Sequence, residues 1–518
     1  MIGIKYRKWF WFCLAMTALF ILLVASPVLA KGPGGGGGGG GGGWGGGGGG
    51  SGVVDPPPGL PFVDPPILDD KNDDPNIFEG YLEAKVATVN VNGVQARLLT
   101  YNGLYPGPMI KVKRGDTLKL HFTNSLASTS EKNILGFYKN HTNIHTHGFH
   151  VSPMEPADAA HLDIPPGGEY DYEYDLSLVD AGTLAILHPH SHGLVAEQYW
   201  GGMIGTIQVA DNISALSAYE RHTLILKDIT LSGNQPEAYS SQMDFMQGKE
   251  GNIIMVNGLV NPVLPIKPGQ VQRWQIVNGS NARYYKLSLE NHTMYLVGTD
   301  DGLLDKYYPV SSLLLAPGER ADILVEASAT TRNYRLLALP YARKGMMTSP
   351  QITLMTLSYQ GSPVNGNLPN PNSVNPNATR LNPADLEIMA TRTLVLSMSQ
   401  GRGYINGMDF DVEPYEIHSE LGTYEIWEII NNSGMDHPFH QHINGAQVLS
   451  ITGGDSSYAS LYTSIPAWKD VVNVPRMGRV KILVPVMDWD GMTMFHCHIV
   501  EHEDIGMMGM WHIMGGGM

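Results

Sequence analysis

From residue 80 to the C-terminus, apolar and polar residues alternate in short runs. These runs have the length of β-strands and are rich in β-branched and aromatic side chains, and Gly, Pro and Asn separate them. Few stretches show the 3.6-residue period of an amphipathic helix. The pattern predicts an all-β protein built from β-sandwiches.

One segment of this pattern recurs twice more, which indicates the number of domains. Residues 113–124 are echoed by residues 267–278 and again by residues 420–431. Three similar turns, at residues 166–168, 317–319 and 476–478, each precede a late strand of one copy. We therefore predict three sandwich domains, each large enough to bury its own core, and a Pro- and Asn-rich linker before the third. The predicted domains are residues 80–212, 213–360 and 385–518, and the predicted linker is residues 361–384.

The first 30 residues have the layout of a secretory signal peptide. Basic residues between positions 5 and 8 precede an apolar run over residues 9–24, and Val28-Leu29-Ala30 forms a small-residue cleavage pattern. A membrane anchor is the alternative, because the run is near the lower length that spans a bilayer. We predict that residues 1–30 are a signal peptide and that the protein is exported to the periplasm or the extracellular medium, without stable membrane insertion after cleavage.

Cleavage would remove Cys13 and leave Cys497 as the only cysteine. A mature protein with one thiol has no disulfide framework. Residues 31–79, first almost wholly glycine and then rich in Pro and Asp, cannot form a core of their own. We predict that they form a flexible segment.

The residues around Cys497 carry the clearest chemical signal. In a β-strand the Cys497 thiol would point to one face, and the flanking His496 and His498 imidazoles to the other. His502 and Met507 follow at five-residue intervals. With one further histidine, these residues would make the His₂Cys set with a weak axial Met that is typical of blue copper. Zinc is the alternative metal, but zinc sites rarely use Met.

Three other histidine clusters, residues 145–147, 188–192 and 437–442, each contain a His-x-His pair. The two imidazoles of such a pair emerge on one face of a strand or extended loop. With His496 and His498 the pairs supply eight histidines, which is enough for a cluster of three copper ions. His437 remains as the fourth ligand for the copper held by Cys497.

These four motifs, in this order, resemble those of the multicopper oxidase family, and the resemblance covers residues 80–518. It implies three consecutive cupredoxin-like Greek-key β-sandwich domains, with copper ligands on the first and third and none on the second. It also implies four copper ions per chain. Thr146 departs from many members of the family, which have Trp there, but this side chain should point away from the metals. The implied ligands are His437, Cys497, His502 and Met507 for a type 1 copper; His145 and His440 for a type 2 copper; and His147, His190, His192, His442, His496 and His498 for a type 3 pair.

The resemblance implies an enzyme that couples one-electron oxidation of a donor at the type 1 copper to four-electron reduction of O₂ to water at the trinuclear cluster. Electrons would pass from Cys497 to His496 or His498 through a few covalent bonds. We expect Glu503 and Asp158 to relay the protons that water formation requires. In the alternative interpretation, Glu503 only hydrogen-bonds a ligand histidine.

Composition bears on the electron donor and on other partners. The formal net charge of −16 argues against nucleic acid or an anionic membrane surface as a partner. The expected partners are O₂ and a small reducing substrate, and we predict laccase-like oxidation of phenols or aromatic amines. The chain contains 25 methionines, several of them near the C-terminus. Because thioethers suit Cu(I), a cuprous oxidase for copper tolerance is the alternative.

Functions outside the oxidase class make separate predictions of copper content. A copper-free structural relative of the fold would bind no copper, and a simple electron-transfer cupredoxin would bind one ion. A copper nitrite reductase would have two such domains and would lack the full set of His-x-His pairs.

Overall fold

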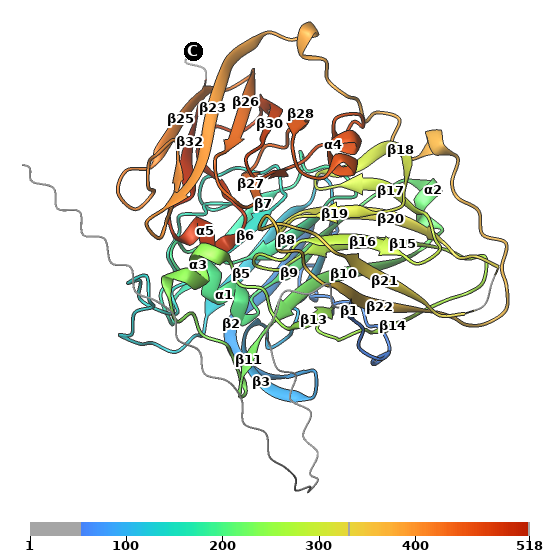
Figure 1. The fold of residues 1–518 in the computed structure, drawn as a ribbon. Coiled ribbons are helices and arrows are strands. Elements are labelled where there is room, and N and C mark those ends of the chain that lie inside the picture. Colours follow the sequence, from blue (N-terminus) through green and yellow to red (C-terminus); the bar gives the residue numbers. More distant parts are fainter. Residues whose placement is uncertain (1–52, 330–331, 516–518) are drawn as a thin grey trace, which may run out of the picture. The chain divides into compact units, whose positions relative to one another are not determined.

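The computed structural model describes residues 53–329 and 332–515, and these form three β-sandwiches of two sheets each (Figure 1). The predicted all-β, three-domain cupredoxin-like fold is confirmed. In the first sandwich a sheet of order β3-β2-β5-β7 packs on a sheet of order β4-β9-β8-β6. Its strands are β2 (Ile77–Val91), β3 (Val94–Tyr101), β4 (Met109–Lys113), β5 (Thr117–Asn124), β6 (His145–His147), β7 (Glu169–Asp175), β8 (Leu184–His188) and β9 (Gly205–Ala210).

The second sandwich has sheets of order β13-β10-β15-β20-β17-β18 and β1-β22-β21-β16-β19, with β14 also paired to β22, and a small β11-β12 ribbon. Its strands are β1 (Val53–Val54), β10 (Glu220–Ile229), β11 (Leu231–Ser232), β12 (Gln235–Pro236), β13 (Ile253–Val256), β14 (Val263–Ile266), β15 (Val271–Asn278), β16 (Tyr285–Leu289), β17 (Met294–Thr299), β18 (Gly302–Val310), β19 (Leu313–Leu315), β20 (Arg320–Glu326), β21 (Tyr334–Leu339) and β22 (Gln351–Tyr359).

The third sandwich has sheets of order β24-β23-β26-β30-β28 and β25-β32-β31-β27-β29. Its strands are β23 (Ile388–Ser399), β24 (Arg402–Ile405), β25 (Tyr415–Glu420), β26 (Thr423–Asn431), β27 (His437–Gln441), β28 (Gln447–Thr452), β29 (Val471–Val474), β30 (Arg479–Val486), β31 (Gly491–Cys497) and β32 (Met508–Met514).

The sequence repeat corresponds to the same strand in each sandwich. β5, β15 and β26 each pair in parallel with an earlier strand and antiparallel with a later one. Each ends at an asparagine, Asn124, Asn278 or Asn431, whose side-chain amide donates to two backbone carbonyls. β5 alternates buried and half-buried residues, whereas β15 is buried throughout because both of its faces are covered. Each copy of the repeat is therefore one strand that ends at an asparagine, and the side-chain amide of that asparagine hydrogen-bonds later parts of the same sandwich.

Residues 53–79, which we predicted to be part of a flexible segment, are instead paired with strands of the first and second sandwiches. β1 pairs in parallel with β22, and the Phe62 and Leu68 amides donate to the carbonyls of Val263 and Met109. The expectation was wrong here because a Pro-rich chain already favours an extended conformation, and its remaining N–H groups can pair with a sheet edge. β2 begins at Ile77, before the predicted start of the first domain. The predicted signal peptide and the glycine-rich run, up to residue 52, lie outside the described residues.

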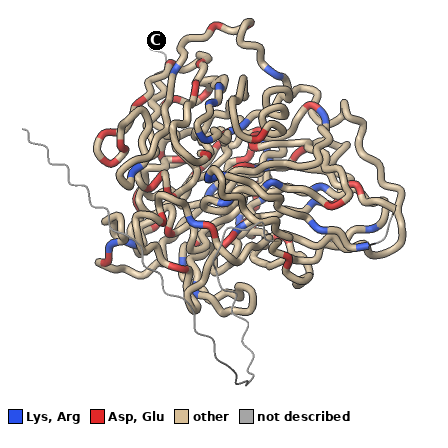
Figure 2. The backbone as a smooth tube through the Cα atoms, viewed as in Figure 1, with Lys and Arg blue, Asp and Glu red and all other residues tan. Residues whose placement is uncertain are grey.

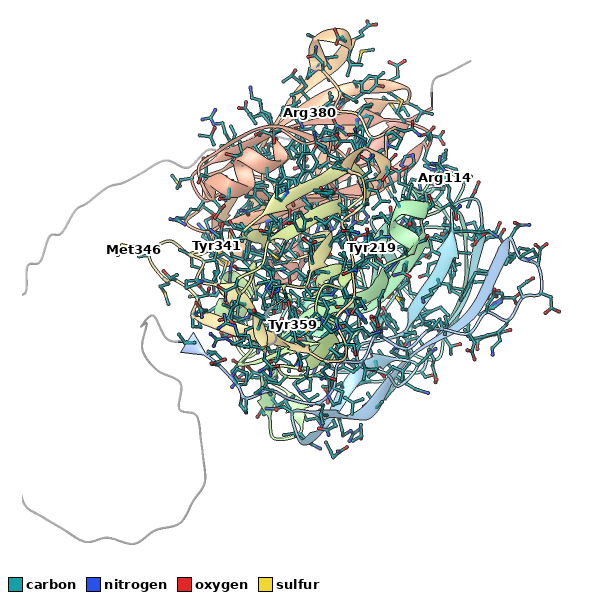
Figure 3. The ribbon with its side chains drawn as sticks, turned by 90° about the vertical axis from the view of Figure 1, so that its right-hand side faces the viewer. Arg114, Tyr219, Tyr341, Met346, Tyr359 and Arg380 are labelled. Carbon is teal, nitrogen blue, oxygen red and sulfur yellow. The ribbon has the colours of Figure 1, made fainter. Side chains whose placement is uncertain are left out.

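The linker between the second and third sandwiches is also held by side-chain hydrogen bonds, one donated by a neighbouring residue and one by the linker itself. The Tyr219 hydroxyl donates to the Asn367 carbonyl, and the Arg380 guanidinium donates to the Ile465 carbonyl; Figure 3 labels both side chains. Two short 3₁₀ turns, η1 (Pro371–Ser373) and η2 (Pro383–Asp385), lie in this segment.

Lys and Arg are interspersed with Asp and Glu along the described chain (Figure 2).

Helices are short and serve mainly to connect strands. They are α1 (Val195–Gly201), α2 (Ser214–Ser217), α3 (Gln242–Gln247), α4 (Ser456–Tyr462) and α5 (Val500–Asp504). Over the ranges that the structure describes, no helix has the length and apolar character needed to cross a membrane. The buried Asp504 at the end of α5 accepts hydrogen bonds from the amides of Gly193, Val195 and Ala196 at the start of α1. This contact joins the third sandwich to the first beside the histidine-rich segments.

Candidate metal centres

Cys497, His437 and His502 bring three donor atoms together in the core of the third sandwich. The Cys497 Sγ lies 3.3 Å from Nδ1 of His437 and 3.5 Å from Nδ1 of His502, and the two Nδ1 atoms are 3.1 Å apart. Cys497 ends β31, His437 begins β27 and His502 lies in α5, and all three are fully buried. The buried Met507 closes the loop after α5, where its amide donates to the His502 carbonyl.

The two imidazoles of this group are oriented by bonds on their far sides. Nε2 of His437 lies 2.7 Å from the Ser433 hydroxyl, and Nε2 of His502 lies 3.3 Å from the Met246 carbonyl. A carbonyl only accepts, so the His502 proton sits on Nε2 and the Nδ1 lone pair faces the sulfur. Burial lowers the pKa of His437 to about 3, with a further contribution from Arg343, and burial raises the pKa of the Cys497 thiol.

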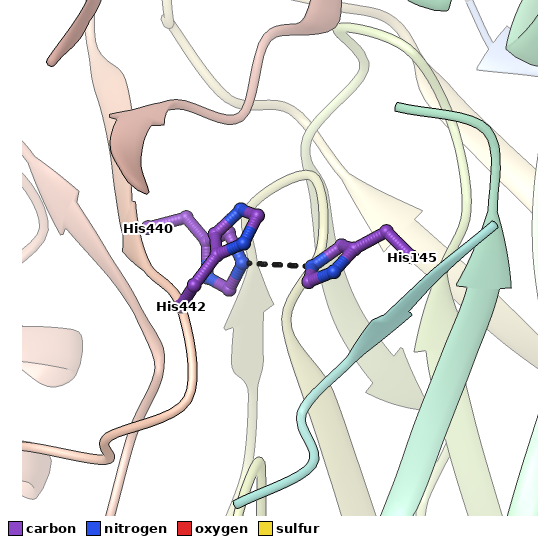
Figure 4. A group of neighbouring side chains, drawn as sticks. All are labelled: His145, His440 and His442. Carbon is purple, nitrogen blue, oxygen red and sulfur yellow. Dashed lines mark hydrogen bonds between the residues drawn. The ribbon is translucent and has the colours of Figure 1, made fainter. Parts of the chain in front are cut away.

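A second group contains eight buried imidazoles at the contact of the first and third sandwiches. Nε2 of His496 lies 3.3 Å from Nε2 of His190 and 3.1 Å from Nε2 of His442. Nε2 of His440 lies 3.5 Å from Nε2 of His145 (Figure 4), and Nε2 of His498 lies 3.0 Å from Nδ1 of His147. The eighth member, His188, has its ring centroid 5.2 Å from that of His145. The eight residues are His145, His147, His188, His190, His440, His442, His496 and His498.

The strand register explains how these imidazoles meet. On β31 the His496 imidazole and the Cys497 thiol point to opposite faces, as the alternation predicts. His440 pairs directly with His496 across β27 and β31, and His145 pairs directly with His188 across β6 and β8. Side chains on directly paired residues share a face of the sheet, so each pair contributes neighbouring donors.

The assignment of His192 to this cluster was wrong, and His188 takes its place. The His188 ring lies among those of His145, His147 and His498, whereas Nε2 of His192 contacts the carboxylate of Asp411 and its side chain is 21% exposed. A His-x-His-x-His segment contains two overlapping pairs, and its sequence does not say which pair is used. His188 is the last residue of β8 and pairs directly with His145, so the pair that is used is His188 and His190.

The two acids that we expected to relay protons both contact the cluster. The buried Glu503 carboxylate lies 3.2 Å from Nδ1 of His496 and 3.5 Å from Nε2 of His190. Burial, with the neighbouring Asp504, raises the Glu503 pKa well above its usual range. Asp158 lies 2.8 Å from Nδ1 of His145 and also accepts from the amide and hydroxyl of Thr146. Burial raises its pKa, but His145 and the Thr146 bonds outweigh burial and lower it overall.

Two further residues at the cluster were missed. Asp470 lies 3.2 Å from Nε2 of His147, and both its oxygens are 2.6 Å from guanidinium nitrogens of Arg320. Arg320 begins β20 of the second sandwich, so the ligand-free middle domain supports the cluster through a fully buried ion pair. Arg320 directly follows the recurrent turn at residues 317–319, which could have pointed to it. The expected absence of copper ligands from the middle domain left Arg320 out of the predicted site.

The structure also brings donors together in a way that fits metal ions. Neutral imidazoles whose ring nitrogens lie 3.0 to 3.5 Å apart repel one another through their lone pairs unless a proton or a cation lies between them. Burial and neighbouring histidines lower the pKa values of His190, His440 and His442 well below the usual range, which disfavours protons. Several sets of three buried donors, among them His437-Cys497-His502 and His190-His442-His496, have ligand atoms within 4.8 Å of one another.

Sequence models of multicopper oxidase domains match three consecutive stretches of the chain, residues 83–214, 208–362 and 377–515. The chain belongs to the multicopper oxidase family. It is 28% identical over 456 residues to the multicopper oxidase Mco of Staphylococcus aureus, covering 86% of this chain and 90% of that protein. It is 27% identical over 452 residues to a laccase of Haloferax volcanii, covering 79% and 76% of the two chains.

Solved structures agree with this membership. A multicopper oxidase of Campylobacter jejuni, described as a metallo-oxidase, superposes with a TM-score of 0.75 at 27% identity, covering 88% of this chain and 96% of that one. Multicopper oxidases are oxidoreductases that use copper, and the histidine and cysteine donors above are chemically suited to it, since thiolate, thioether and imidazole are favoured copper ligands.

A cavity of about 580 Å³ lies beside the His437 and His502 group. Ser433, which contacts Nε2 of His437, and Met246, whose carbonyl contacts Nε2 of His502, both line it. Four of its lining side chains are thioethers, and the others that bear polar groups are amides and a serine. The thioethers are Met243, Met246, Met398 and Met435.

Proposed function

We propose that this protein couples one-electron oxidation of a small donor to four-electron reduction of O₂ to water, with phenols or aromatic amines as donors, as a laccase does. The supporting observation is that Cys497 and His496 are consecutive residues whose side chains belong to the two separate donor groups. When bound, copper would supply the one-electron redox couple at the first group and the O₂-reducing centre at the second.

The proposed ligands follow from the contacts, with His188 in place of His192. The Cys497 group would hold one copper, and the eight-histidine cluster would hold three, giving four per chain. We assign His437, Cys497, His502 and Met507 to type 1; His145 and His440 to type 2; and His147, His188, His190, His442, His496 and His498 to the type 3 pair.

The acids take different roles in this proposal. Glu503 reaches imidazoles from both the first and the third sandwich and holds its proton in a buried site, so it is placed to pass protons to the cluster. Asp158 is kept ionised and is fully engaged by His145 and Thr146. We infer that Asp158 mainly orients His145 and fixes the proton on Nδ1, leaving Nε2 for the metal.

Cuprous ion is the second candidate donor, and the cavity beside His502 favours it. Four thioethers line that cavity, and thioethers suit Cu(I). The alternative role of these methionines is to give a flexible apolar surface that accommodates aromatic donors. The two donors therefore compete for the same cavity.

Oxygen uptake decides between the two donors. The copper-loaded protein is supplied in parallel with Cu(I) and with a simple methoxyphenol. Strong uptake with the phenol supports the laccase-like function, whereas strong uptake with Cu(I) alone assigns the protein as a cuprous oxidase. Uptake with neither donor, at full copper occupancy, would contradict both.

We also propose that residues 1–30 are removed on export, so that the mature enzyme acts in the periplasm or outside the cell. N-terminal sequencing of the mature protein tests this. A start near residue 31 supports export, and an intact N-terminus in the cytoplasmic fraction would contradict it.

A further inference from the structure

The outer face of the sheet containing β25, β32 and β31 carries side chains that the proposed function does not use. Phe495 and Cys497 on β31 point into the core of the sandwich, so Met492, Met494 and His496 point outward. On β32, Trp511 and Ile513 point inward, and the alternate residues Met508, Met510 and His512 therefore share the outer face.

The strand register places these residues in two rows. In one row, Met492, His512 and His418 are direct neighbours across the three strands. In the next row, Met494, Met510 and Glu416 are direct neighbours in the same way. Directly paired side chains lie about 5 Å apart at Cβ, so a continuous stripe of thioethers and imidazoles covers this face.

At the surface end of the stripe, three potential ligands converge. Nε2 of His418 lies 3.4 Å and Nε2 of His512 lies 3.8 Å from the same Glu416 oxygen. The two rings are stacked, with centroids 4.7 Å apart and planes 12° from parallel. The His418 and Glu416 side chains are 54% and 48% exposed. Nε2 of His512 is itself buried and has no hydrogen-bond partner among the described residues.

At the inner end, the stripe reaches the histidine cluster. Met494 and Met508 are buried, and with His190 they line a cavity of about 340 Å³. Met510 packs against both of them, and Met508 pairs directly with His496. The thioethers thus connect the exposed imidazoles with two members of the cluster.

We propose that Glu416, His418 and His512 form a surface site for Cu(I), and that Met510, Met494 and Met508 lead the ion inward while the histidine cluster is being loaded. Imidazole suits copper, and thioether is a soft ligand that suits Cu(I). The loading role rests on the proposed function, because it takes the cluster as the destination of the copper.

The surface site is tested with Ag(I), a redox-inert monovalent ion, titrated by calorimetry into the copper-loaded protein. The variant is H418A/H512A, which removes the exposed His418 ring and the half-buried His512 ring. The matched control is H121A, because His121 is a half-exposed histidine that contacts the carboxylates of Asp171 and Glu79. Among the described residues, the ring stacked on it is that of Tyr81 and not a second imidazole.

We expect the double variant to lose one Ag(I) equivalent, or to bind it at least about tenfold more weakly, while H121A binds as the wild type does. Equal binding by wild type and double variant would overturn the proposal. O₂ uptake is measured on the same samples. A protein that failed to consume O₂ would refute the proposed function, yet its Ag(I) titration would still report on the surface site.

The inward route is tested by the rate at which the copper-depleted full chain takes up Cu(I) from a weak chelator without O₂. We expect H418A/H512A and M510L to fill the cluster at least about threefold more slowly and to reach the same final copper content. Loading at the wild-type rate in both variants would overturn the route, even if Ag(I) binding were lost.

Discussion

Cys497 and His496 are joined by one peptide unit, yet their side chains serve two different groups of donors. The Cys497 Sγ lies 3.3 Å from Nδ1 of His437 in the core of the third sandwich, and Nε2 of His496 lies 3.1 Å from Nε2 of His442 in the cluster. Opposite orientation of successive residues in a strand produces this arrangement. Only a few covalent bonds therefore separate the two groups of donors.

Replacing Cys497 with Ser should remove one copper and leave the others. Serine keeps the approximate volume, but a neutral hydroxyl is a poor copper ligand compared with a thiolate. We expect copper content to fall by about one ion per chain and donor-driven O₂ uptake to fall at least about a thousandfold, as measured by elemental analysis and an oxygen electrode. Retained uptake in this variant would show that electrons do not enter at Cys497.

His188→Ala and His192→Ala form a matched pair that tests the corrected ligand set. The His188 ring lies within the cluster, and His192 lies outside it on Asp411. We expect the first variant to lose copper from the cluster and at least about a hundredfold in O₂ uptake, and the second to stay within about threefold of wild type. A larger loss of copper and O₂ uptake in His192→Ala than in His188→Ala would indicate that His192 is the ligand.

The sequence was sufficient to predict the all-β fold, the three-fold repeat and the family, because strand alternation and the ligand spacings are local properties. It did not resolve the choice between His188 and His192, which depends on where β8 ends and which residue faces His145. Asp470 and Arg320 were missed for a similar reason. Their ion pair joins residues 150 positions apart, and only the packing of the second sandwich on the third brings them together.

Glu503→Gln should slow O₂ reduction without removing copper. Glutamine preserves the shape of the side chain and its contacts with His496 and His190, but it cannot transfer a proton. We expect O₂ uptake to fall at least about tenfold at unchanged copper content. Full uptake at every pH would mean that Glu503 only hydrogen-bonds its histidine neighbours.

Glu250 should make stability depend on pH through its contacts with three cations. Burial raises its pKa, but Arg343, Arg283 and Lys344 outweigh burial and lower the pKa from 4.5 to about 2. A folded-state pKa below the unfolded value stabilises the protein above the unfolded pKa, and this stabilisation is lost as the pH falls toward 2.

Urea unfolding of Glu250→Gln checks this dependence. We expect the variant to unfold at a lower urea concentration than wild type at pH 7. The difference between their urea midpoints should narrow between pH 5 and pH 2. Glu413→Gln is the control, because no Lys or Arg among the described residues forms an ion pair with Glu413, whereas Glu250 contacts Arg283, Arg343 and Lys344. A difference in urea midpoint that stayed constant with pH would show that the variant loses stability through packing and not through the charge of Glu250.

Copper stoichiometry, measured together with the reduction product of O₂, tests the central claim most directly. The purified chain is loaded with copper, analysed for metal, and supplied with a limiting amount of electron donor. We predict about four copper ions per chain and four electrons consumed per O₂, with no hydrogen peroxide released. One copper per chain without O₂ consumption would indicate an electron carrier, and none would indicate a relative that keeps the fold without the metal.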